Sequence, residues 1–128
     1  QKLKVSISTG KLEDLLENSD FISLHVPMPK DGKAVIGSDE FKSMKEDVRI
    51  VNASRGGVID ESALIEALEG GKVSFAALDV FVGEPSPSIE ILNNDKISLT
   101  PHIGAATTEA QDRIGTELAE KIINFYNQ

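Results

Sequence analysis

Three ionisable residues have the types and the setting that proton transfer requires. Arg55 precedes two glycines, Glu84 lies in a loop rich in glycine and proline, and His102 follows a proline. A carboxylate beside an imidazole fixes its tautomer and favours its protonated form, which suits a general acid or base near neutral pH. The planar donors of arginine fit a carboxylate on a small substrate. Together the three residues would serve proton transfer at an alcohol or carbonyl beside an anchored carboxylate.

The same residues have a simpler interpretation, in which each is an ordinary charge on a surface loop. For Glu84 taken alone this interpretation is the favoured one, because its loop is predicted to be exposed. An isolated histidine such as His102 is also more often structural than catalytic. The catalytic hypothesis gains weight because all three residues follow apolar stretches at equivalent positions.

Other residues near these stretches leave two interpretations open. Asp79 interrupts a run of Ala and Val, and a buried carboxylate needs partners. It is therefore either an acceptor for loop amides or a contact for a ligand. His25 lies inside a strand candidate and is interpreted as structural or as the wall of a pocket. Gly56 and Gly57 allow close approach of a ligand or form a plain strand-to-helix turn.

The composition excludes several classes of function. The 128 residues carry 21 acidic and 13 basic side chains, a formal net charge of −8 and no cysteine. The absence of cysteine argues against a disulfide framework and a thiolate metal site, and two histidines argue against zinc, so no metal is expected. The acidity argues against nucleic acid as a partner. No apolar run approaches the ~20 residues of a membrane span and no signal peptide is visible, which predicts a soluble cytoplasmic protein with no membrane partner.

The elements that must position these residues alternate along the chain. Apolar runs predict strands over residues 4–7, 21–26, 48–52, 73–80 and 97–100. Helical spacing predicts helices over residues 11–18, 38–44, 60–69 and 89–92. A long helix follows, in which Thr108 and Gln111 have the spacing of a capping box. The alternation predicts an α/β fold, with a parallel sheet covered by helices on both faces. Ligands gather at the carboxyl ends of such strands, where the polar residues above are found.

Several stretches of the chain are recognisable as motifs of one family. They are Asn52–Glu61, Ala77–Phe81, Glu84–Pro85 and Thr100–Ala105, and Ser19–Pro27 fits the same pattern. In this order they resemble the C-terminal half of the catalytic region of NAD-dependent D-2-hydroxyacid dehydrogenases, over nearly the whole chain. The resemblance implies the second half of a Rossmann-type NAD-binding domain over residues 1–106. Residues 107–128 would form a long helix that returns toward the substrate domain.

The resemblance also implies a role for each residue. The family's substrate arginine, carboxylate partner and acid/base histidine fall on Arg55, Glu84 and His102. Its NAD-contacting positions fall on Val26, Ala53, Ser54, Arg55, Asp79, His102, Ile103, Gly104 and Ala105. The implied function is hydride transfer between NAD(H) and a small D-2-hydroxy acid or 2-oxo acid. Residues 48–52 and 106–111 favour 3-phosphoglycerate, the substrate of a step in serine biosynthesis.

The family pattern further indicates what the sequence lacks. It holds no Gly-x-Gly-x-x-Gly fingerprint for the pyrophosphate, no acidic ribose contact and no substrate domain. We therefore expect a piece of a longer chain, inactive by itself and a homodimer in its full-length form. Two alternatives stay open. One is a non-catalytic NAD-linked interaction module or engineered half-domain, and the other is an unrelated flavodoxin-like binding domain.

Overall fold

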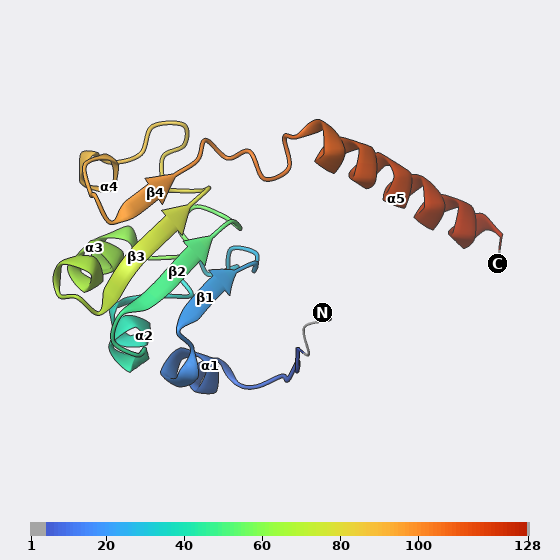
Figure 1. Ribbon diagram of the computed structural model, residues 1–128. Coiled ribbons are helices and arrows are strands. Elements are labelled where there is room, and N and C mark those ends of the chain that lie inside the picture. Colours follow the sequence, from blue (N-terminus) through green and yellow to red (C-terminus); the bar gives the residue numbers. More distant parts are fainter. Residues whose placement is uncertain (1–4, 128) are drawn as a thin grey trace.

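A sheet of four parallel strands forms the centre of the computed structural model, which describes residues 5–127 (Figure 1). The strands follow one another in space as in sequence, in the order β1-β2-β3-β4. Their bounds are Phe21–Leu24, Val48–Asn52, Val73–Leu78 and Ile97–Leu99. The predicted α/β fold with a parallel sheet is confirmed. The strand expected over 4–7 is not formed at residues 5–7, which are irregular, and residue 4 lies outside the described residues.

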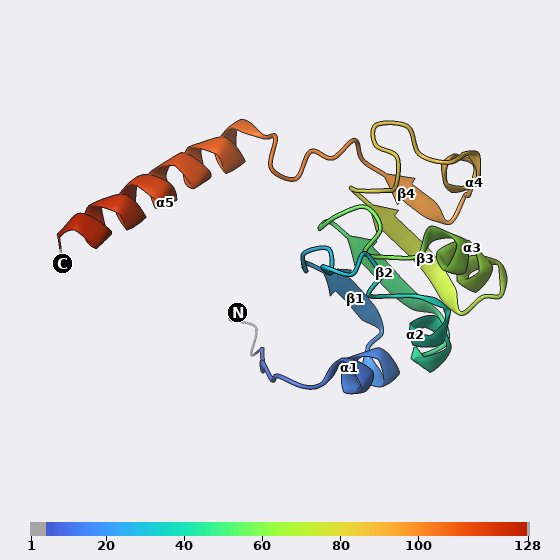
Figure 2. The same ribbon diagram turned by 180° about the vertical axis from the view of Figure 1, so that it is seen from behind.

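Helices precede β1, separate successive strands and follow β4. They are α1 (Leu12–Asn18), α2 (Ser38–Ser43), α3 (Glu61–Glu69), α4 (Ile89–Leu92) and α5 (Thr108–Tyr126). Crossovers between parallel strands are right-handed, and here the strand order never reverses, so α2, α3 and α4 fall on the same face of the sheet. Views from opposite sides show this single layer (Figures 1 and 2). The expectation of helices on both faces is therefore wrong for the described residues.

The covered face of the sheet and the helices enclose the core. In β2 the first, third and fifth residues are buried and the two between them are exposed. The buried side chains pack against the apolar stripe of α3, whose first turn is capped by Asp60, the acceptor for the Ala63 N–H at 3.0 Å. The largest fully buried side chains include Ile36, Ile50, Ile59, Leu64, Leu68 and Ile91. This core holds the strand ends and the start of α3 in fixed positions beneath the loops.

The opposite face of the sheet presents exposed side chains in rows set by the register. Phe21, Arg49 and Phe75 are partners across β1, β2 and β3. The guanidinium of Arg49 lies 5.0 Å from the centre of the Phe21 ring, and Phe21 keeps 68% of its surface exposed. Apolar surface of this kind is characteristic of a face that packs against another element or another protein.

The long C-terminal helix α5 is confirmed and projects away from the sheet (Figures 1 and 2). Its cap differs from the expected one. Thr107, one residue before Thr108, accepts from the Ala110 N–H at 3.2 Å, and the Gln111 side chain donates to the Ala105 carbonyl. The apolar stripe of the helix is exposed at Ile114, Leu118, Ile122 and Phe125. Over residues 5–127 no helix combines the length and the apolar character needed to cross a membrane.

Candidate active site

The loops that follow the strands meet at the carboxyl edge of the sheet, where open parallel sheets bind ligands. A cleft of about 540 Å³ opens between the loops after β1 and β2, a size typical of small-molecule sites. Four residues predicted to contact the cofactor line it, namely Val26, Ala53, Ser54 and Arg55. His25 also lines it and lies 2.8 Å from the Ser23 hydroxyl through Nε2, so its interpretation as the wall of a pocket is confirmed.

The loop after β2 is shaped by Asn52, whose side chain is 2% exposed. Its Oδ1 accepts from the backbone N–H of Ser54 at 3.1 Å and from the Ser54 hydroxyl at 2.7 Å. Its Nδ2 donates to the carbonyl of Arg55 at 3.1 Å. These bonds fix the backbone that carries Arg55, while the exposed guanidinium donates through Nη1 to the adjacent Ser54 carbonyl at 2.6 Å.

The sequence patterns predicted no positioning role for Asn52, although a signal for one exists. Val48 and Ile50 alternate as buried residues, and continuing that alternation places Asn52 on the buried face. A buried amide must be hydrogen-bonded, which points to a role in shaping the following loop.

Glycine is required where the loops after β2 and β3 approach each other. A Cβ at Gly56 would lie 2.2 Å from the carbonyl oxygen of Phe81, a distance that no side chain tolerates. Gly57 has a φ of 83°, in the left-handed region that favours glycine. The two glycines therefore allow the loop of Arg55 to pack against the segment that leads to Glu84.

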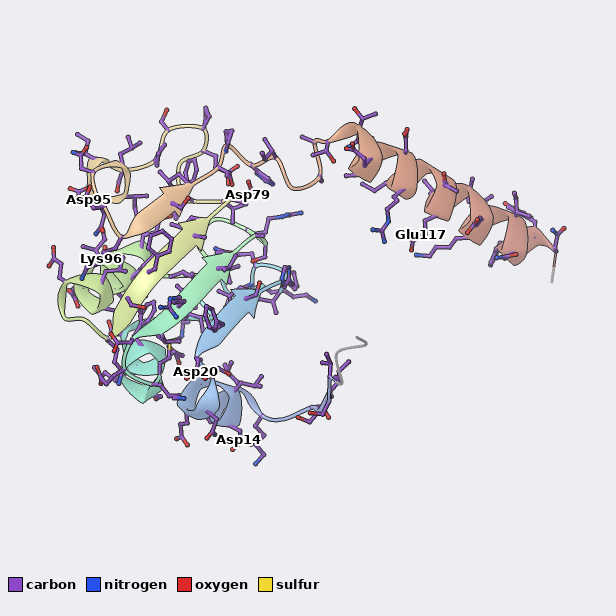
Figure 3. The ribbon with its side chains drawn as sticks, viewed as in Figure 1. Asp14, Asp20, Asp79, Asp95, Lys96 and Glu117 are labelled. Carbon is purple, nitrogen blue, oxygen red and sulfur yellow. The ribbon has the colours of Figure 1, made fainter. Side chains whose placement is uncertain are left out.

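Asp79 directly follows β3 (Figure 3), and its carboxylate accepts hydrogen bonds from the loop after β4. Its Oδ1 accepts from the Thr100 hydroxyl at 2.5 Å and from the Ile103 N–H at 3.0 Å, and its Oδ2 accepts from the Gly104 N–H at 3.0 Å. Partial burial raises the pKa of Asp79, but these hydrogen bonds outweigh it and hold the pKa below its ordinary value. Of the two interpretations left open, the acceptor for loop amides is the one observed.

Glu84 and His102 form a close pair. Glu84 Oε2 lies 2.6 Å from His102 Nδ1, and Glu84 Oε1 accepts from the Phe81 N–H at 3.2 Å. The hydrogen bond with His102 holds the pKa of Glu84 below its ordinary value; partial burial opposes this shift and the Phe81 N–H adds to it. Both side chains are part-exposed, so the pair can be reached by a small molecule. Because Nδ1 is hydrogen-bonded to the carboxylate, Nε2 is the imidazole nitrogen that could exchange a proton with a small molecule.

The backbone at His102 has a φ of 53°, an uncommon conformation for a residue with a side chain. Such residues cost about 1–3 kcal/mol and persist where the surroundings hold them. Here the His102 N–H donates to the Thr100 carbonyl at 3.0 Å, and Asp79 holds the next two amides. The loop thus presents the imidazole in a fixed position beside Glu84.

The site residues predicted from sequence fall into two groups. One contains Asp79, Glu84, His102, Ile103 and Gly104 in direct hydrogen bonds, and the other lines the cleft. Ala105 is exposed at the start of the segment that leads to α5. In the part of the chain that is described, no cluster of three or more His, Cys, Asp or Glu side chains could hold a metal ion.

The amino-acid sequence matches a known family over most of its length. Residues 1–104 match the family described as D-isomer specific 2-hydroxyacid dehydrogenase, NAD binding domain. The chain belongs to this family. Among curated members, it is 45% identical over 123 residues to D-3-phosphoglycerate dehydrogenase of Archaeoglobus fulgidus, covering 95% of the chain and 23% of that protein. It is 51% identical over 115 residues to hydroxypyruvate reductase of Thermotoga maritima, covering 87% of the chain and 37% of that protein.

A solved protein structure is also similar to the chain. D-lactate dehydrogenase from Aquifex aeolicus, complexed with NAD and lactic acid, matches with a TM-score of 0.71 and 32% identity. The match covers 92% of the chain and 40% of that structure. The chain therefore has the fold of the family's NAD-binding domain and spans well under half the length of these relatives.

Proposed function

We propose that the complete protein is an oxidoreductase that transfers a hydride between NAD(H) and a small D-2-hydroxy acid or its 2-oxo acid. The observation that carries the proposal is the Glu84–His102 pair, with 2.6 Å between Oε2 and Nδ1. A carboxylate bound to one imidazole nitrogen fixes the tautomer and leaves the other nitrogen to exchange a proton with a substrate. Membership of an NAD-binding family supports the choice of cofactor.

His102 carries the proton in this proposal. In the reducing direction the imidazolium donates the Nε2 proton to the 2-oxo oxygen while a hydride adds to C2, so that one O–H and one C–H bond replace the carbonyl π bond. Glu84 stabilises the imidazolium through Nδ1, and Arg55 binds the substrate carboxylate through paired N–H donors. In the oxidising direction neutral His102 accepts the hydroxyl proton.

The cleft after β1 and β2 fits one end of a dinucleotide. Its wall is apolar at Val26, Pro27 and Met28, which suits the face of a nicotinamide ring. Bound NAD(H) supplies the hydride donor or acceptor. Oδ2 of Asp79 accepts one hydrogen bond and has capacity for a second, which suits the N–H of a carboxamide. We place Ala53, Ser54 and residues 103–105 around the same end of the cofactor.

For the substrate we propose 3-phosphoglycerate, supported by the similarity to D-3-phosphoglycerate dehydrogenase. Hydroxypyruvate is the second candidate, because hydroxypyruvate reductase is a relative at 51% identity. The 2-oxo acids to compare are 3-phosphohydroxypyruvate, the oxidised form of 3-phosphoglycerate, and hydroxypyruvate, which share the carboxylate and the carbonyl and differ in a phosphate. Rates of NADH oxidation with 3-phosphohydroxypyruvate and with hydroxypyruvate will separate them. A higher kcat/KM for the phosphorylated acid supports the first candidate, and the reverse ranking supports the second.

The reaction itself is tested by isotope transfer in the complete protein. Incubation of a 2-oxo acid with NADH deuterated at C4 of the nicotinamide should give a hydroxy acid deuterated at C2. His102→Asn should abolish most turnover, whereas Glu69→Gln, at the exposed end of α3, should leave it unchanged. A product without deuterium from either face of the labelled ring would refute the proposed function.

One observation favours a second candidate function, a non-catalytic NAD-linked interaction module. The open face of the sheet and the apolar stripe of α5 are surfaces that a partner could cover. Under this hypothesis His102→Asn in the complete protein changes neither partner binding nor any rate.

We also propose that the complete protein is a homodimer. Light scattering on the purified protein measures its molar mass and therefore tests this proposal. The 128 residues alone should show no turnover.

A further inference from the structure

Glu61, a residue to which the family motifs assign no role, contacts the loop that carries Glu84. Glu61 is the first residue of α3, and its half-buried side chain accepts from the backbone N–H of Val82 through Oε1 at 2.6 Å. Val82 lies two residues before Glu84 in the loop after β3. The bond therefore joins a rigid helix to the segment that presents the carboxylate to His102.

The segment Phe81–Glu84 has few other connections of this kind. The Phe81 N–H donates to Glu84, and the Ser86 N–H donates to the Gly83 carbonyl, so both bonds are internal to the loop. Gly83 has a φ of 80°, a turn conformation that supplies no anchor. Among the hydrogen bonds of the described residues, the bond from Val82 to Glu61 is the one that ties this segment to a helix.

The start of α3 is a suitable anchor because the rest of the helix is fixed in the core. Asp60 caps the helix, and Ala63 and Leu64 in its first turn are buried. A bond from a backbone N–H to an ionised carboxylate is also about twice as strong as one between neutral groups. A site supported by such an anchor holds its reacting groups within a few tenths of an ångström.

We propose that Glu61 is a positioning residue for the acid/base pair, holding Val82 so that Glu84 meets His102. This inference rests on the proposed function for its kinetic consequence, but not for its structural one. Among the described residues Glu61 makes no hydrogen bond with His102 and does not line the cleft of Arg55, so it would act through the backbone N–H of Val82. Displacement of Glu84 by about an ångström would reduce proton transfer without changing the binding of NADH.

The test uses the complete protein and a graded set of substitutions. Glu61→Ala removes the acceptor and should lower kcat roughly ten- to a hundredfold, with the KM for NADH unchanged. Glu61→Gln keeps a side-chain oxygen at the same position and should restore most of kcat. Glu69→Ala removes a carboxylate from the exposed end of the same helix and is the matched control. An unchanged kcat in Glu61→Ala, with the fold intact, would overturn the inference.

A double-mutant cycle distinguishes positioning from a general loss of stability. On a Glu84→Gln background the carboxylate is already absent, so adding Glu61→Ala should cost little more in kcat. Full additivity of the two losses would show that Glu61 does not act through Glu84. If Glu61→Ala fails to fold, the cycle is run with Glu61→Lys, which also removes the acceptor.

A second measurement keeps the inference separate from the proposed function. Hydrogen–deuterium exchange of the peptide that contains Val82 should be faster in Glu61→Ala than in the parent, and unchanged in Glu61→Gln. If the parent shows no hydride transfer while this exchange pattern is found, the proposed function fails and the positioning of the loop stands. Equal exchange in all three proteins would overturn the inference whatever the activity.

Discussion

The loops after β3 and β4 hold their ionisable side chains in fixed contacts, whereas those after β1 and β2 leave theirs open to the cleft. Asp79 accepts three hydrogen bonds, and Glu84 is paired with His102. Among the described residues, the guanidinium of Arg55 bonds with a neighbouring carbonyl alone, and the His25 ring with a hydroxyl two residues away. The Glu84–His102 pair, proposed for proton transfer, is thus already assembled, whereas Arg55, proposed to bind the substrate, would reach its final geometry with a ligand.

The difference follows from the chemistry of the side chains. Carboxylates are acceptors, and loops after parallel strands offer unpaired backbone N–H donors that they can bind. Arginine carries donors only and needs an external carboxylate to satisfy its planar fork. Under the proposed function, a guanidinium that has no carboxylate partner among the described residues is available to bind the carboxylate of the substrate.

The largest effect on activity is expected at Arg55, which lines the cleft between the loops after β1 and β2. Arg55→Ala in the complete protein should reduce kcat/KM for the 2-oxo acid by roughly 10²- to 10⁴-fold, because two charged hydrogen bonds are lost. The melting temperature should stay unchanged, since the guanidinium is exposed and, within residues 5–127, its one hydrogen bond is with the Ser54 carbonyl. Arg55→Lys keeps the positive charge but lacks the paired donors of a guanidinium, so its kcat/KM should lie between those of the parent and of Arg55→Ala. A normal kcat/KM in Arg55→Ala would remove the proposed carboxylate site.

Sequence patterns located the site residues better than they located their supports. Arg55, Asp79 and His102 could be placed because each follows an apolar strand, and parallel strands bring their carboxyl ends to one edge. The open face of the sheet was not predicted, because an apolar strand does not reveal that the strand order never reverses. Contacts between side chains and backbone, such as those of Asn52 and Glu61, depend on loop geometry that periodicity does not encode.

The next prediction concerns the support beneath Arg55. Asn52→Ala should destabilise the fold by about 1–3 kcal/mol for each buried group left unpaired, here the Ser54 N–H and the Ser54 hydroxyl. Urea unfolding of the purified chain measures the loss. Asn94→Ala is the control, because the Asn94 side chain accepts an exposed bond from the Lys96 N–H, whose loss should cost far less. Equal losses in the two variants would mean that the Asn52 bonds add no stability.

A smaller effect on activity is expected at Gly56, where the loop after β2 contacts the loop after β3. Gly56→Ala places a Cβ that would lie 2.2 Å from the Phe81 carbonyl oxygen, so the loops must separate at a cost of about 1–3 kcal/mol. Both the KM for the substrate and kcat should change, since Arg55 and Glu84 are displaced together. Gly115→Ala, in α5 with no atom near its Cβ position, is the matched control and should be neutral or slightly stabilising. Unchanged kinetics in Gly56→Ala would show that the two loops are independent.

The smallest expected effect tests how far Asp79 fixes the loop of His102, through the pH dependence of stability. The pKa of Asp79 is held below its ordinary value of 3.8 by hydrogen bonds that outweigh partial burial. The ionised carboxylate of Asp79 therefore stabilises the fold at pH values above its ordinary pKa, and this contribution is lost as pH falls through the lowered pKa of the folded state.

In Asp79→Asn the side-chain NH2 group would face the N–H of Ile103 or of Gly104, so that one of these two hydrogen bonds is lost. The variant should therefore be less stable than the parent at pH 7. The gap should narrow steadily between pH 5 and pH 2 in urea unfolding, because the parent loses its advantage as the carboxylate is protonated. A gap that stays constant over this range would mean that the charge of Asp79 contributes nothing and that its hydrogen bonds act as neutral ones.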